Sequence, residues 1–134
     1  MASPAAAPLP LRRRKSKTAL LISPFEQDHK LFKLLFTEQG WKLHRASSLE
    51  SALRLLRQGI ASLVIAEKDL PNGTWKDVLG AVLQLSSAPP VVVTSLHADD
   101  YLWAEALNLG AYDVLAKPFE RTEAIRVCSS AWMR

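Results

Sequence analysis

The sequence predicts a single α/β domain in which helices cover both faces of a five-stranded parallel sheet. From Thr18 onward, short apolar runs alternate five times with amphipathic stretches, and this rhythm is typical of parallel pairing with right-handed crossovers. Several of the apolar runs lack polar alternation, as expected of strands that are buried on both faces. A length of 134 residues and a hydrophobic content of 49% suit one domain with one sizeable core.

The expected strands are short and differ in their apolar pattern. Residues 63–66 and 91–93 are continuously apolar, whereas 41–46 alternates with period two, which favours a position nearer a sheet edge. In chain order, the expected strands are 19–22, 41–46, 62–66, 91–94 and 114–116.

Five amphipathic stretches predict the helices. Leu31, Leu34 and Leu35 supply a wide apolar face to the first of them. Ser47 and Glu50 have the spacing of a capping box that opens the second. The helices are expected at 27–39, from the capping box to Gly59, and at 75–85, 99–109 and 121–132, with Pro71-Asn72-Gly73 as a turn between the third strand and the third helix.

The charge is concentrated near the amino terminus. The net charge is +4, from 17 basic and 13 acidic residues, and five of the basic residues fall within 12–17. Without them, twelve basic residues face thirteen acidic ones, so the rest of the chain is close to neutral. We therefore divide the chain into a basic Ala/Pro-rich tail at 1–16, expected to be disordered, and a domain at 17–134. A solvated leader is favoured over nucleic-acid binding for the tail, and no nucleic-acid binding is expected of the domain.

Several classes of protein are disfavoured by what the sequence contains. No apolar stretch approaches the roughly 20 residues of a membrane span, and the basic run follows the Ala/Pro-rich stretch, which is the wrong order for a secretory signal. We expect a cytoplasmic protein. Cys128 is the single cysteine, expected in the core, and no metal site is expected. Glycine-rich phosphate loops and hydrolase motifs are missing from the sequence, so no enzyme activity is expected.

A functional site in such a sheet is expected outside the carboxyl ends of the strands. These ends fall at residues 23–26, 67–73, 94–97 and 117–119.

Three segments at these positions resemble a known family. They are Glu67–Gly73, which reads EKDLPNG, Val91–Ser95, which reads VVVTS, and Gly110–Phe119, which reads GAYDVLAKPF. In this order and spacing, the chain from Lys17 to its end resembles a response-regulator receiver domain of the chemotaxis type. The resemblance implies a flavodoxin-like (βα)5 three-layer sandwich with strand order 2-1-3-4-5.

The resemblance also implies a phosphate switch. Receivers accept a phosphoryl group on an aspartate four residues before the turn proline, with Mg²⁺ held by acidic residues at the end of the first strand. A hydroxyl and a lysine on later strands bind the phosphoryl oxygens. Thr94 and Lys117 match the hydroxyl and the lysine, and Glu67 falls at the acceptor position.

Four positions depart from the family pattern. The acceptor position holds the glutamate Glu67 in place of an aspartate. The acidic pair falls on Ser23 and Pro24, which are expected to form a lost metal pocket, and the aromatic switch position falls on Val114. Proline offers no side-chain ligand, and Mg²⁺ requires hard oxygen donors. We therefore expect a degenerate pseudo-receiver that binds Mg²⁺ weakly or not at all and needs no other cofactor. Glu67 either mimics phosphoaspartate by reaching Thr94 and Lys117, or forms a structural ion pair with Lys117.

Other polar residues at the strand ends have simpler interpretations. Asp69 is interpreted as a turn residue. Glu26 and Asp28 are interpreted as carboxylates that favour the positive end of the first helix. His29, like the other two histidines, is expected at the surface or in a loop.

The function expected from the sequence is that of a stand-alone signalling module in a two-component phosphorelay, acting by protein–protein contact without phosphorylation. The partner would be a histidine kinase, an output protein or a second copy of the chain. The resemblance places the interface on the fourth helix, fifth strand and fifth helix, where Trp103 and Trp132 are the candidate contact residues. The alternatives are a receiver that accepts phosphate with atypical site chemistry, and a flavodoxin-like small-molecule binder.

Overall fold

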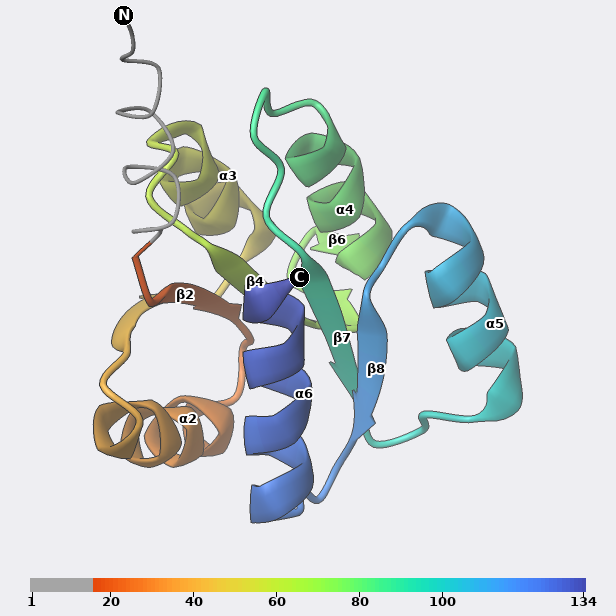
Figure 1. Cartoon of the computed structure of the whole chain (residues 1–134). Coiled ribbons are helices and arrows are strands. Elements are labelled where there is room, and N and C mark those ends of the chain that lie inside the picture. Colours follow the sequence, from red (N-terminus) through yellow and green to blue (C-terminus); the bar gives the residue numbers. More distant parts are fainter. Residues whose placement is uncertain (1–15) are drawn as a thin grey trace, which may run out of the picture.

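Five parallel strands form the central sheet of the computed structural model, which describes residues 16–134. The order across the sheet is β3-β2-β4-β7-β8 (Figure 1). Counted along the chain, this is the order 2-1-3-4-5, so the expected fold class is confirmed. The strands are β2 (Thr18–Ile22), β3 (Lys42–Ala46), β4 (Leu63–Glu67), β7 (Val91–Ser95) and β8 (Asp113–Ala116).

Within residues 16–134, five helices cover the two faces of the sheet (Figure 1). Helices α2 (Glu26–Glu38) and α6 (Arg121–Met133) pack on one face. Helices α3 (Leu49–Arg57), α4 (Trp75–Leu83) and α5 (Asp100–Leu109) pack on the other. The result is the expected three-layer arrangement.

The sheet separates two apolar cores, and strand β2 contributes to both. Leu20 and Ile22 point to the core under α3, α4 and α5, whereas Ala19 and Leu21 point to the core under α2 and α6. All four residues are at most 1% exposed, because successive side chains of a strand point to opposite faces. This double burial explains why the run from 19 to 22 has no polar alternation.

Cys128 lies in the core under α2 and α6 and is 1% exposed. Its burial in apolar surroundings raises the pKa of the thiol to about 12, so the thiol stays protonated near neutral pH. The expected core role of this cysteine fits its position.

Two local details differ from the expectations. Helix α3 is capped by Ser48 together with Ser51, and not by Ser47 and Glu50; Ser48 has the extended backbone of an N-cap, which places its hydroxyl against the amide of Ser51. The Pro71-Asn72-Gly73 turn closes a small antiparallel hairpin between β5 (Asp69–Leu70) and β6 (Gly73–Thr74). Asn72 has a φ of 66°, which asparagine tolerates better than most residues.

The expected tail lies, apart from Ser16, outside the described residues. Within the described residues 16–134, none of the helices is long and apolar enough to cross a lipid bilayer.

Candidate functional site

The carboxyl ends of β4, β7 and β8 bring three sequence-predicted residues together. Glu67 ends β4, Thr94 lies opposite it on β7, and Lys117 follows β8 directly. The Thr94 hydroxyl donates a hydrogen bond of 2.7 Å to Glu67 Oε1. The Lys117 ammonium lies 3.0 Å from the same oxygen. The hydroxyl, the carboxylate and the ammonium therefore form one contiguous cluster.

Lys117 is shared between two carboxylates. Its Nζ atom lies 3.1 Å from Asp28 Oδ2 and 3.0 Å from Glu67 Oε1, and all three side chains are at most 10% exposed. The Phe25 ring lies above the ammonium, with its centroid 4.4 Å from Nζ, a cation–π distance. Two carboxylates and one ammonium leave the cluster with a formal charge of −1.

Asp28 belongs to this cluster, and its interpretation as a carboxylate that only favours the helix end was incomplete. The Ser23 hydroxyl donates a 2.6 Å hydrogen bond to Asp28 Oδ2, and Asp28 is only 6% exposed. A signal for this burial exists in the sequence, because Asp28, Phe32 and Leu35 follow the i, i+4, i+7 spacing of one helix face. Phe32 and Leu35 are core residues, so Asp28 points to the sheet with them.

His29 is also buried, at 5% exposure, which makes the expected surface position wrong. Its Nε2 atom lies 2.8 Å from the Ser23 carbonyl oxygen. A carbonyl only accepts, so Nε2 carries the proton in this bond. Among the described residues, Nδ1 has no hydrogen-bond partner. His29 therefore helps to fix the turn between β2 and α2.

Ser23 and Pro24, the residues expected to mark a lost metal pocket, lie beside the cluster. Ser23 is fully buried, and its hydroxyl is committed to Asp28 while accepting a 3.0 Å bond from the Phe25 amide. Pro24 is exposed and has no side-chain donor. Asp28, the carboxylate bonded to Ser23, also contacts Lys117. Glu26 lines the same hollow as Ser23 and Pro24 and pairs with Arg45 at 3.8 Å.

Comparison with known proteins identifies the family. A family model described as the response regulator receiver domain matches residues 26–128. The chain belongs to this family. Receiver domains are modules of two-component signalling, so the small-molecule-binder alternative is set aside.

Relatives of this receiver include longer regulators. The chain is 32% identical over 104 residues to the transcriptional regulatory protein KdpE of Mycobacterium tuberculosis, a match that covers 78% of this chain and 46% of that protein. The chain thus spans less than half the length of this relative.

Solved receiver structures share the fold. A two-component response regulator from Clostridium difficile has a TM-score of 0.80 at 21% identity, covering 89% of this chain and 98% of that chain. The beryllofluoride-activated NtrC4 receiver domain dimer has a TM-score of 0.81 at 20% identity, covering 87% and 97%.

The switch position of this receiver carries an aliphatic side chain. Val114 lies on β8 and is 5% exposed, within the core under α3, α4 and α5. A valine has no ring that could rotate between an exposed and a buried position, and Val114 packs in this core.

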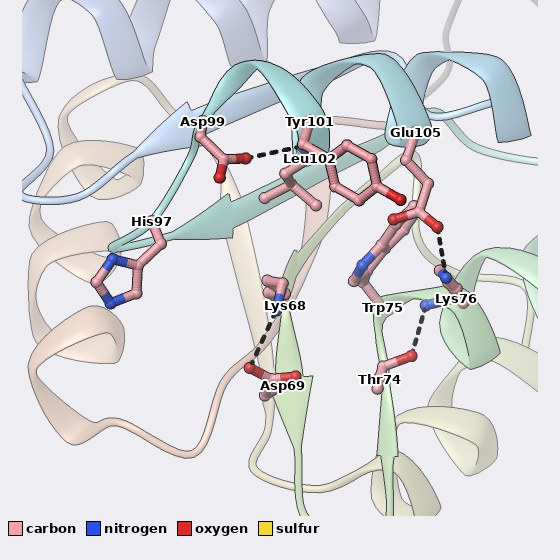
Figure 2. A pocket seen from close by; sticks show the side chains of 10 residues that line it. All are labelled: Lys68, Asp69, Thr74, Trp75, Lys76, His97, Asp99, Tyr101, Leu102 and Glu105. Atoms are coloured by element: carbon pink, nitrogen blue, oxygen red, sulfur yellow. Dashed lines mark hydrogen bonds and ion pairs between the residues drawn. The ribbon is translucent and has the colours of Figure 1, made fainter.

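A hollow lies between the β5–β6 hairpin, the start of α4 and helix α5 (Figure 2). Its volume is about 350 Å³, and Glu67, Thr94 and Lys117 do not line it. Four of its charged groups are paired, Lys76 with Glu105 and Lys68 with Asp69 at 3.5 Å. The hollow is therefore separate from the cluster of Glu67, Thr94 and Lys117.

The two tryptophans expected at the partner surface differ in their environment. Trp103 on α5 is 44% exposed. Trp132 on α6 is only partly exposed: it packs edge-on against Trp41, with centroids 5.7 Å apart, and its indole N–H donates to the Ser16 carbonyl. Trp132 thus has an evident packing role, and Trp103 is the stronger candidate for a partner contact.

Proposed function

We propose that this receiver domain is a degenerate, phosphorylation-independent module of a two-component system, which acts through protein–protein contacts. Its partner would be an output protein or a histidine kinase, in the cytoplasm. The alternative is a receiver that accepts a phosphoryl group through atypical chemistry at the same strand ends. The proposal rests on the state of the residues that would serve that chemistry.

The proposal depends on the two contacts that Glu67 makes with Thr94 and Lys117. Its Oε1 atom accepts from the Thr94 hydroxyl at 2.7 Å and contacts the Lys117 ammonium at 3.0 Å. These are the two groups that the family uses to bind phosphoryl oxygens. A carboxylate already occupies both, so an incoming phosphoryl group would have to displace it from a pocket where it is 6% exposed.

The residues near Ser23 also argue against Mg²⁺ binding. The ion takes octahedral oxygen coordination and usually keeps one or two protein carboxylates plus waters. Here Asp28 and Glu67 are both paired with Lys117, and Glu26, which lines the hollow with Ser23 and Pro24, is paired with Arg45. Within residues 16–134, no group of three His, Cys, Asp or Glu side chains could hold a metal ion. The residues present do not fit the ion.

Glu67 fits a structural ion pair better than a full mimic of phosphoaspartate. A phosphoryl group brings a charge of about −1.5 to −2 and three acceptor oxygens, whereas Glu67 brings one negative charge. Lys117, which would bind the phosphoryl oxygens, also forms an ion pair with Asp28. We propose that Glu67 holds Thr94 and Lys117 in one fixed arrangement.

Incubation with Mg²⁺ and a small-molecule phosphodonor is expected to leave the mass of the native protein unchanged. Glu67 is a methylene longer than aspartate, and the metal that stabilises phosphoryl transfer lacks its ligands. Intact-mass spectrometry measures the outcome, with a receiver that keeps the acceptor aspartate and the acidic pair as the positive control.

A Glu67→Asp variant in the same experiment separates the two causes. If this variant gains a phosphoryl group and the native protein does not, the acceptor alone blocks the reaction. A phosphoryl adduct on the native protein contradicts the proposal and favours the alternative.

Self-association through α5, β8 and α6 is part of the proposal. Glu105 of α5 pairs with Lys76 of α4, and Trp103 lies two residues earlier, roughly 200° around the helix. Trp103 therefore faces away from α4, toward the β8 side. Leu107, one turn later on the same side, is 39% exposed. Exposed aromatic and aliphatic residues of this kind mark interfaces, and the beryllofluoride-activated NtrC4 receiver domain is a dimer.

The Trp103→Ala variant is expected to weaken this self-association at least about tenfold, the effect of losing an interfacial tryptophan. Sedimentation velocity over a concentration series measures the dimer fraction. Tyr101→Ala is the matched control, because Tyr101 is 82% exposed on the same helix but lines the hollow next to α4. A native protein that stays monomeric at all concentrations contradicts a homodimer.

A further inference from the structure

Helix α2 begins without a side-chain cap. Its N-cap residue, Phe25, offers no side-chain hydrogen bond to the first turn, although helix starts usually depend on such bonds. The first turn is instead hydrogen-bonded to Ser23, which directly follows β2. The Ser23 hydroxyl accepts from the Phe25 amide and donates to Asp28. The start of α2 is therefore fixed by side chains of the candidate site.

Asp28 connects Ser23, at the end of β2, with Lys117, at the end of β8. Its Oδ2 atom receives both the Ser23 hydroxyl at 2.6 Å and the Lys117 ammonium at 3.1 Å. Ser23 follows β2 and Lys117 follows β8, so one carboxylate oxygen links α2 to two strand ends that are not neighbours in the sheet. Such a charge-assisted contact between nearly buried groups is stronger than a surface pair.

We infer that Asp28 is the positioning residue of Lys117, and that it holds the ammonium between α2 and Glu67. This inference rests on the proposed function, because it specifies how the unphosphorylated pocket is kept in one arrangement. Glu67 accepts a hydrogen bond from Thr94, and Asp28 accepts one from Ser23. The ammonium of Lys117 therefore lies between two carboxylates that are each held in place by a hydroxyl. Without the Asp28 carboxylate, the Lys117 ammonium keeps its ion pair with Glu67 only, and the start of α2 loses its contact with the end of β8.

The reactivity of Lys117 toward an amine-acylating ester tests this inference. Mass spectrometry of peptides after a short pulse of sulfo-N-hydroxysuccinimide acetate gives the acylation rate of each lysine in the full chain. In Asp28→Asn we expect the Lys117 rate to rise about fivefold or more, because one of its two ionic contacts is lost. Exposed Lys30, on the same helix, serves as the internal reference.

Glu26→Gln is the matched control, since it removes the same charge from the same helical turn. Glu26 pairs with Arg45 at 3.8 Å and not with Lys117, so the Lys117 rate is expected to stay at the native value. A rate that is unchanged in Asp28→Asn, or raised equally by both variants, overturns the inference. Because Asp28→Glu keeps the charge, partial restoration of the slow rate is expected and would not follow from a purely steric role.

A measurement on the native protein covers the case in which Asp28→Asn does not fold. Nuclear Overhauser contacts between the Lys117 Cε protons and the Asp28 Cβ protons are expected, and their absence overturns the inference. The two proposals fail separately: a phosphoryl adduct on the native chain contradicts the proposed function and leaves the Lys117–Asp28 contact in place. An unchanged Lys117 rate in Asp28→Asn contradicts only the positioning role.

Discussion

Replacing Lys117 by methionine is expected to lower the free energy of unfolding by about 3–5 kcal/mol, the usual cost of breaking a buried ion pair by removing one partner. Methionine matches the length of the lysine stem but carries no charge. The carboxylates of Asp28 and Glu67, each 8% exposed, would then lie close together without a cation. Urea unfolding followed by tryptophan fluorescence measures the change.

Two variants control this experiment. Lys76→Met removes a lysine whose partner, Glu105, lies at the surface, and is expected to cost less than about 1 kcal/mol. Combining Lys117→Met with Glu67→Gln is expected to recover part of the loss, because one uncompensated charge is removed as well. If Lys117→Met costs no more than Lys76→Met, the cluster is solvated and contributes little to stability.

Replacing Phe32 by alanine is expected to cost a similar amount, about 3–5 kcal/mol, as do other large-to-small changes at fully buried aromatic positions. Phe32 is 0% exposed. Its ring meets Phe36 with centroids 5.5 Å apart, and meets Phe119 edge-on at 4.9 Å. Phe119 follows the Lys117-Pro118 turn, so the cavity would open directly beneath the site.

Leu34→Ala is the control on the same helix. Leu34 is 65% exposed, so its loss is expected to change stability by less than about 0.5 kcal/mol. The same urea series gives both values. Equal losses in the two variants would mean that α2 does not use Phe32 as its anchor in the core.

The strand ends were predictable from the sequence because parallel strands are short, apolar and all end at one edge of the sheet. That rule predicts that Glu67, Thr94 and Lys117 lie together, and the structure has them in direct contact. The strand order came from the family resemblance, since apolar runs alone do not say which strands are neighbours.

The rest of the site depended on which side of a helix each residue faces. Asp28 and His29 were interpreted by residue type and position near a helix start, and both proved to be buried. A charged residue that shares the spacing of Phe32 and Leu35 faces the sheet whatever its polarity, because one rigid helix orients all three side chains. The hairpin of β5 and β6 was missed because two-residue strands are too short to show a periodicity.

The double burial of β2 limits how the length of this chain can vary. An inserted or deleted residue within 18–22 would exchange Leu20 and Ile22 with Ala19 and Leu21 between the two cores, and so misplace every side chain beyond it in the strand. The same residue added to the turn between α4 and β7 would leave both cores in register. Insertions that preserve this domain are therefore expected in the connections between its elements and not within β2, whose length and register are fixed by the two cores.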